Sequence, residues 1–182
     1  MMSLINMLVN KKMPPEKAFF LRLIHNRDVS ILFQPISDLT NGDVFGIEAL
    51  CRGPINTKYY DPVALLTSGE DVGLLYPLES MIRENSIRKF SGLGLSSKLF
   101  LNLTPKIVNE PGFAKGQTRR LVKHLGIQPS QVVFEITERS SIKDFTSFRK
   151  ALEHYREQGF LVAVDDAGAG YSSLQAIAEL HP

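Results

Sequence analysis

Short apolar runs alternate with helical segments along most of this chain, and this alternation is the feature that most limits its fold. The runs predict strands at 30–36, 43–50, 99–103, 131–136 and 160–164. Asn41-Gly42 is typical of a tight turn, so the first two strands are expected to form a hairpin. Helices separate the later strands, which favours a parallel sheet covered by helices.

Apolar residues at helical spacing, together with capping and stop signals, predict the helices between these strands. We expect helices at 14–27, from 61 onward, at 74–90, 113–125 and 144–158, and from Ser172 to the end. The strand at 160–164, FLVAV, is apolar throughout. Such a run is typical of a strand that is buried on both faces.

Polar side chains stand toward the carboxyl ends of four predicted strands, at Glu48, Asn102, Glu135 and Asp165. The last three follow one another at intervals of 33 and 30 residues, which is the length of one βαβ unit. In a (β/α) barrel the carboxyl ends of all parallel strands open into one mouth. The sequence therefore predicts three carboxylates and one amide in one place.

Several carboxylates in a half-buried cup repel one another unless a positive charge joins them. Mg²⁺ and Mn²⁺ prefer the oxygen ligands that Glu, Asp and Asn supply. Asp166, next to Asp165, adds a carboxylate for a second cation at about 3.5–4 Å from the first. Two cations at that spacing suit phosphoester hydrolysis.

Each of these motifs alone also has an ordinary structural interpretation. Glu48-Ala49-Leu50 could be a helix fragment, and Asn102 could cap a turn before Thr104-Pro105. Glu135 and Glu138 could form a capping pair. Asp165-Asp166 could begin a plain loop; the glycine-rich segment after it lacks the lysine of a phosphate-binding P-loop, which excludes that class.

In combination, the motifs resemble the EAL domain family over about residues 30–182. Residues 48–52, Glu-Ala-Leu-Cys-Arg, are similar to the signature of that family. The other matching motifs are Gln34-Pro35-Ile36, Asn102-Leu103-Thr104-Pro105, Glu135-Ile136-Thr137-Glu138 and Asp165-Asp166-Ala167-Gly168-Ala169-Gly170-Tyr171-Ser172-Ser173.

The resemblance implies a TIM-like (β/α) barrel with an antiparallel first strand and a phosphodiesterase that hydrolyses cyclic di-GMP to linear pGpG. It also implies Mg²⁺ or Mn²⁺ in a two-metal site. The implied metal ligands are Glu48, Asn102, Glu135, Asp165 and Asp166, and the implied catalytic residues are Glu48, Asp165 and Asp166. Gln34, Leu50 and Arg52 are expected to contact the dinucleotide. An arginine fork can donate two hydrogen bonds to a phosphate.

The glycine-rich loop carries two departures from the family pattern. The resemblance implies that Glu138 positions the loop at 165–173, which is also implicated in dimer contact. Ala167 stands where the family usually has Phe, and Ala169 replaces a common Thr. We expect these changes to tune the site rather than abolish it.

The family barrel continues past the segment that corresponds to Pro182. The family's lysine near the attacking water, a further metal-binding Glu and a Gln at the substrate have no match in this chain. We therefore expect an incomplete barrel without its closing strands and weak or no activity. A homodimer or a partner chain could cover the open edge. The alternative functions are a non-catalytic cyclic di-GMP-binding module and an interaction module.

Composition sets the remaining expectations. The chain has 182 residues, 43% of them hydrophobic, and a formal charge of +2, which argues against a binder of nucleic-acid polymers and against a disordered tail. We expect a helical extension at 1–27 and one domain at 28–182. The single cysteine, Cys51, is interpreted as a strand residue rather than a nucleophile. No secretory signal or membrane segment is evident, so a cytoplasmic location is expected.

Overall fold

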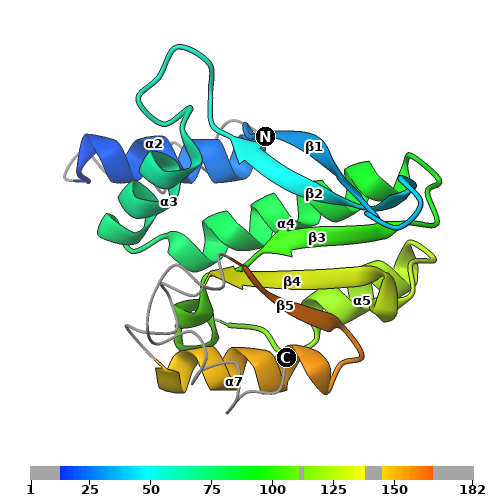
Figure 1. Ribbon diagram of the computed structural model, residues 1–182. Coiled ribbons are helices and arrows are strands. Elements are labelled where there is room, and N and C mark those ends of the chain that lie inside the picture. Colours follow the sequence, from blue (N-terminus) through cyan, green and yellow to red (C-terminus); the bar gives the residue numbers. More distant parts are fainter. Residues whose placement is uncertain (1–12, 111–112, 138–144, 166–182) are drawn as a thin grey trace, which may run out of the picture. The chain divides into compact units, whose positions relative to one another are not determined.

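The computed structural model describes residues 13–110, 113–137 and 145–165. The elements, in chain order, are α2 Pro15–Asn26, β1 Ser30–Ser37, β2 Val44–Arg52, α3 Pro62–Asp71, α4 Leu75–Ser91, β3 Lys98–Asn102, the 3₁₀ helix η1 Pro105–Asn109, α5 Gln117–His124, the 3₁₀ helix η2 Pro129–Gln131, β4 Val132–Thr137, α7 Phe145–Arg156 and β5 Leu161–Asp165 (Figure 1). All five expected strands are confirmed. No helix in these ranges is long and apolar enough to cross a membrane.

The helices differ from expectation at the start of α5 and at the two 3₁₀ helices. Helix α5 begins at Gln117 rather than 113, because Gly116 precedes it in a left-handed conformation that an α-helix cannot include. The two 3₁₀ helices were not predicted, since they are too short to show a helical period. The helix expected from Ser172 lies outside the described residues.

The strands form one five-stranded sheet in the order β1-β2-β3-β4-β5 (Figure 1). Strands β1 and β2 are antiparallel, and β2 to β5 are parallel. The hairpin turn closes with hydrogen bonds from the Asp38 amide to the Asp43 carbonyl and from the Gly42 amide to the Asp38 carbonyl, each 2.8 Å long. This arrangement confirms the expected α/β fold with its antiparallel first strand.

The described residues divide into two compact units, one within 13–32 and Cys51–Asn85 and the other within Phe33–Leu50 and 86–165. In the first unit, Phe20, Leu65 and Leu78 are completely buried. In the second unit, the Phe134 ring on β4 packs against Tyr155 on α7, with ring centroids 4.0 Å apart. Each unit therefore has its own apolar core.

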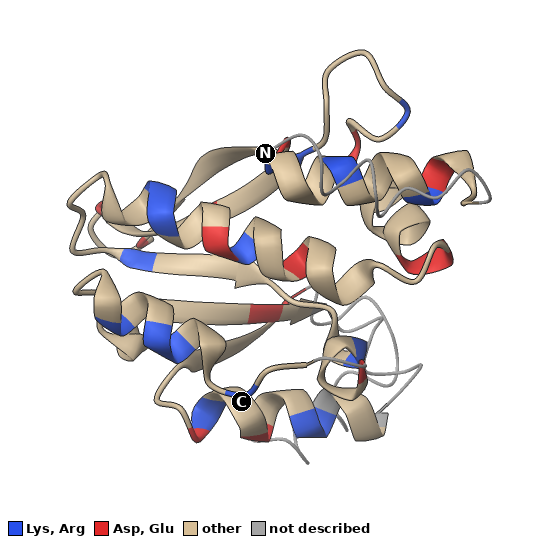
Figure 2. Ribbon diagram, turned by 180° about the vertical axis from the view of Figure 1, so that it is seen from behind, with Lys and Arg blue, Asp and Glu red and all other residues tan. Residues whose placement is uncertain are grey.

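The sheet of the second unit has one apolar face. This face carries buried side chains from two neighbouring strands, which are Leu99, Leu101, Val132, Phe134 and Ile136. Seen from behind, α5 lies in front of the sheet (Figure 2). The amphipathic helices bury one sheet face, and the opposite face remains available for polar side chains.

Gly46 on β2 provides a test of this packing. A Cβ at Gly46 would lie 2.5 Å from Cε2 of Phe100 and 3.0 Å from the Lys98 carbonyl oxygen. Because the Phe100 ring is buried, Gly46→Ala should lower the free energy of unfolding by about 1–3 kcal/mol. Urea denaturation measures this change.

Gly92→Ala is the matched control for Gly46→Ala. A Cβ at Gly92 would make only ordinary contacts, the nearest at 3.5 Å from the Lys89 carbonyl oxygen. This variant should stay within about 0.5 kcal/mol of the unaltered chain. Equal effects of the two substitutions would contradict the packing described for Gly46.

Candidate metal and phosphate site

The register of the parallel strands places four polar side chains on one face of the sheet. Asn102 on β3 and Glu135 on β4 are direct Cα partners. Glu48 pairs with Phe100, two residues before Asn102, and Asp165 stands two residues after Ala163, the partner of Glu135. Because side chains two residues apart share a strand face, all four predicted ligands project from the same side.

Two of these side chains are in direct contact. The Asn102 amide nitrogen Nδ2 donates a hydrogen bond of 2.7 Å to Oε1 of Glu48. The two residues are 54 positions apart in the sequence, and the pairing of β2 with β3 brings them together. The contact orients the Glu48 carboxylate and brings the middle of β2 together with the end of β3.

Glu135 lies in an electrostatically unfavourable position. Burial, together with the negative charges of Glu48 and Asp165, raises the pKa of its carboxyl group to about 7, and burial is the largest of these causes. Its buried oxygen Oε2 has no hydrogen-bond partner. A divalent cation beside Glu135 would satisfy this oxygen and offset the repulsion, so the residues fit the expected metal.

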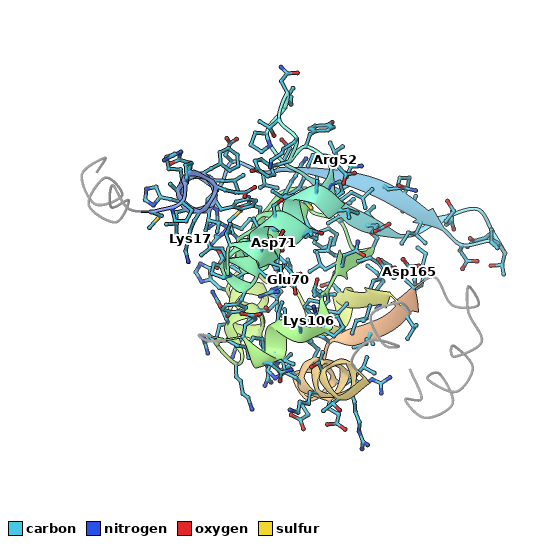
Figure 3. The ribbon with its side chains drawn as sticks, turned by 90° about the vertical axis from the view of Figure 1, so that its left-hand side faces the viewer. Lys17, Arg52, Glu70, Asp71, Lys106 and Asp165 are labelled. Carbon is cyan, nitrogen blue, oxygen red and sulfur yellow. The ribbon has the colours of Figure 1, made fainter. Side chains whose placement is uncertain are left out.

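The carboxylates alone do not form a finished metal centre. Within 13–110, 113–137 and 145–165, no three His, Cys, Asp or Glu side chains are grouped closely enough to hold an ion. The predicted ligand Asp166 lies outside the described residues. The described part therefore supplies Glu48, Asn102, Glu135 and Asp165 as candidate ligands, of which Asp165 is exposed at the end of β5 (Figure 3).

The expected substrate contacts lie on the first two strands. Leu50 is half-buried and stands two residues after Glu48, on the same face of β2. Arg52, labelled in Figure 3, ends β2, and its Nη1 donates a 2.7 Å hydrogen bond to the Cys51 carbonyl. Gln34 is exposed on β1. Glu138 and residues 166–173 of the glycine-rich loop are outside the described ranges.

Cys51 lies beside the signature but is poorly suited to nucleophilic chemistry. Burial raises the pKa of its thiol to about 11, and the nearby charge of Arg52 only partly opposes this shift. Since the thiolate is the reactive form, Cys51 stays protonated and inert at neutral pH. This agrees with its interpretation as a strand residue.

Phe100 contributes to this face, although it does not stand out in the sequence. Its ring covers Gly46, which precedes Glu48 by two residues on the same face of β2. A glycine inside a strand often marks the close approach of another group. Gly46 was therefore the available sequence signal for this packing.

Comparison with known protein families gives a match to the EAL domain over residues 18–182. The chain is 31% identical over 162 residues to the probable cyclic di-GMP phosphodiesterase PdeB of Escherichia coli K12, covering 86% of this chain and 31% of PdeB. It is 28% identical to the probable cyclic di-GMP phosphodiesterase PdeI of the same strain, covering 85% of this chain and 21% of PdeI. The chain thus spans a third or less of these two relatives.

Two solved structures show the same fold. Klebsiella pneumoniae BlrP1, in a complex with calcium and cyclic di-GMP, matches with a TM-score of 0.73 and 29% identity over 86% of this chain and 39% of BlrP1. The FimX EAL domain of Pseudomonas aeruginosa, bound to cyclic di-GMP, has a TM-score of 0.78 and 20% identity over 92% of this chain and 68% of its own. Because the family match covers most of its length, the chain belongs to the EAL domain family.

Proposed function

We propose that the protein carrying this chain hydrolyses cyclic di-GMP to linear pGpG with Mg²⁺ or Mn²⁺. The observation that carries the proposal is that Glu48, Asn102, Glu135 and Asp165 project from one sheet face, where a buried oxygen of Glu135 lacks a hydrogen-bond partner. The similarity to the probable cyclic di-GMP phosphodiesterases PdeB and PdeI, and the cyclic di-GMP in the BlrP1 complex, support the same substrate class.

In this proposal the carboxylates and the amide act as ligands. Glu48, Asn102, Glu135 and Asp165 hold one cation, and Asp165 with Asp166 holds a second. A bound Mg²⁺ or Mn²⁺ would stabilise negative charge on the phosphate and lower the pKa of a water molecule. The Asn102 amide keeps the Glu48 carboxylate oriented.

The substrate-binding roles rest on side chains of β1 and β2. Arg52 donates hydrogen bonds to a phosphate of the dinucleotide, for which it exchanges its bond to the Cys51 carbonyl. Leu50 supplies an apolar contact and Gln34 a polar one. Glu138 positions the loop that follows β5 and thereby Asp166.

Hydrolysis is tested with the purified full chain, cyclic di-GMP and Mn²⁺, with pGpG separated by chromatography. Glu48→Gln should lower the rate of pGpG release by about 100-fold or more, because it removes a charged ligand and alters the partner of Asn102. Glu157→Gln makes the same chemical change at an exposed residue after α7 and should leave the rate unchanged. Equal and measurable rates of pGpG release in both variants would contradict the role of Glu48.

The raised pKa of Glu135 predicts a pH-dependent stability of the metal-free chain. The ordinary pKa of 4.5 applies in the unfolded state and about 7 in the folded state, so the folded state binds the proton more tightly. The resulting stabilisation is present below about pH 4.5 and is lost as the pH rises to about 7.

Glu135→Gln tests this dependence, because glutamine stays neutral at every pH. The melting temperature of the variant, relative to the unaltered chain, should be higher near pH 8 than near pH 5 when a chelator is present. Thermal denaturation followed by circular dichroism measures both values. A difference that does not change with pH would show that Glu135 does not titrate in this window.

Metal binding should compete with the proton at Glu135. Because a carboxylate must be deprotonated to bind a cation, the Mn²⁺ affinity of the unaltered chain should fall as the pH falls below about 7. Glu135→Gln should bind Mn²⁺ more weakly and lose most of this pH dependence. Calorimetric titration at several pH values measures both effects, and unchanged affinity in the variant would exclude Glu135 as a ligand.

A second candidate function is the binding of cyclic di-GMP without hydrolysis. The observation that favours it is that the described acidic residues do not gather as a group of three around one point. Calorimetry that shows nucleotide binding, together with no pGpG under the conditions above, would support this alternative. Hydrolysis that depends on Glu48 would exclude it.

A further inference from the structure

The segment that follows Arg52 folds back on itself as a short loop. This 53–61 loop closes where the Gly53 amide donates to the Tyr60 carbonyl, at 3.3 Å. Inside it, the Thr57 hydroxyl donates to the Pro54 carbonyl at 2.7 Å. At its end, Asp61 accepts a 3.0 Å bond from the Ala64 amide and caps α3. The backbone after Arg52 is therefore constrained at both ends of the loop.

Tyr59 attaches this loop to helix α2. Its ring, only 8% exposed, stacks on Phe19 at 4.8 Å and meets Phe20 edge-on at 5.1 Å. Its hydroxyl donates a 2.6 Å hydrogen bond to Oε1 of Glu16. Lys58 also bonds this oxygen, at 3.1 Å. One residue of the loop thus has both apolar and polar contacts with α2.

The backbone of Tyr59 is in tight contact with Gly53, the residue after Arg52. A Cβ at Gly53 would lie 2.1 Å from the Tyr59 carbonyl oxygen, so the two backbone segments touch where only glycine fits. A shift of Tyr59 would therefore displace Gly53. Arg52 precedes Gly53 directly, and the direction of its side chain depends on this stretch of backbone.

The charge states strengthen the bond between Tyr59 and Glu16. Hydrogen bonds from Tyr59, and then from Lys58, lower the pKa of the Glu16 carboxyl. Burial, and then the bond to Glu16, raises the pKa of the Tyr59 hydroxyl. At neutral pH a protonated phenol therefore donates to an ionised carboxylate, and such charge-assisted hydrogen bonds are stronger than neutral ones. The ion pair between Lys58 and Glu16 is exposed and therefore adds little to the stability of this contact.

We propose that Glu16 and Tyr59 form a latch through which helix α2 positions Arg52 for the phosphates of the dinucleotide. The latch is defined as the Tyr59 hydroxyl bond to Glu16 together with the packing of the Tyr59 ring on Phe19 and Phe20. Both latch residues are positioning residues that act through Arg52. The inference rests on the proposed function, because it assigns Arg52 to the substrate.

The first experiment measures the loop without any ligand. Tyr59→Phe removes only the hydroxyl, and its matched control, Tyr60→Phe, makes the same change one residue later, where the side chain is 45% exposed. Hydrogen exchange of the Gly53 amide, which bonds the Tyr60 carbonyl, should become faster in Tyr59→Phe and stay unchanged in Tyr60→Phe. An unchanged Gly53 amide in Tyr59→Phe would overturn the latch.

The second experiment measures affinity for cyclic di-GMP by calorimetry of the full chain in Ca²⁺. The Tyr59→Phe variant should bind cyclic di-GMP about threefold to tenfold more weakly than the unaltered chain, because it lacks the hydrogen bond from the hydroxyl. Mn²⁺ affinity, measured separately, should stay unchanged, because the candidate metal ligands are other residues. A general loss of structure would instead weaken both affinities together.

A double-mutant cycle tests whether the latch acts through Arg52. Arg52→Ala should weaken nucleotide binding, and adding Tyr59→Phe to it should cause no further loss. Glu16→Gln retains an acceptor for the hydroxyl and should bind more tightly than Glu16→Ala. A Tyr59→Phe effect of the same size with and without Arg52 would overturn the proposal.

The outcomes separate the latch from the proposed function. If the unaltered chain binds no cyclic di-GMP in either Ca²⁺ or Mn²⁺, the proposed function and the role of the latch in recognition both fail. If the unaltered chain binds and Tyr59→Phe binds equally well, the latch alone fails. If Tyr59→Phe binds cyclic di-GMP more weakly, Tyr60→Phe does not, and the difference disappears without Arg52, the result supports both the latch and the proposed function.

Discussion

The in-register pairing of parallel strands is the constraint on which the candidate site depends. Pairing of Asn102 with Glu135 fixes β3 against β4, and the neighbouring pairs extend the same register to β2 and β5. A slip by one residue would turn a whole strand over and send its polar side chain into the apolar face. The buried residues of that face, such as Leu101 and Phe134, hold the register because slipping would expose them.

The register also brings negative charges close together, and this repulsion is what would favour a bound cation under the proposed function. A half-buried carboxylate near two other negative charges is unfavourable without a cation, and the raised pKa of Glu135 reflects that cost. Folding energy from the apolar face offsets it. The shared register therefore places Glu48, Glu135 and Asp165 on one sheet face, where a divalent ion, under the proposed function, would relieve their mutual repulsion.

The sequence predicts the candidate ligands best where a polar side chain interrupts or ends an apolar run. The apolar runs predict Glu48, Asn102, Glu135 and Asp165 toward the carboxyl ends of strands. Asn102 and Asp165 do end β3 and β5, whereas Glu48 lies in the middle of β2 and Glu135 lies two residues before the end of β4. Which face each side chain occupies could not be predicted, since register is set by pairing across the sheet. The direct bond between Asn102 and Glu48 follows from that register.

The contact of Glu16 with Tyr59 shows the limit of sequence reasoning most clearly. The two residues are 43 positions apart, and no motif or period connects them. The bond arises from packing of aromatic rings on α2, which depends on the tertiary structure of the first unit. Gly53 was visible in the sequence, but the backbone contact that requires it was not.

The most direct test of a shared metal site is paramagnetic broadening of backbone amide signals by Mn²⁺, measured by nuclear magnetic resonance on the full chain. Bound Mn²⁺ broadens the signals of nearby nuclei only. If the four side chains share one ion, substoichiometric Mn²⁺ should broaden the amides of Glu48, Asn102, Glu135 and Asp165 together, and more strongly than the amide of the exposed Glu157 after α7. Broadening confined to one strand end, or centred elsewhere, would contradict convergence of the four side chains on a metal.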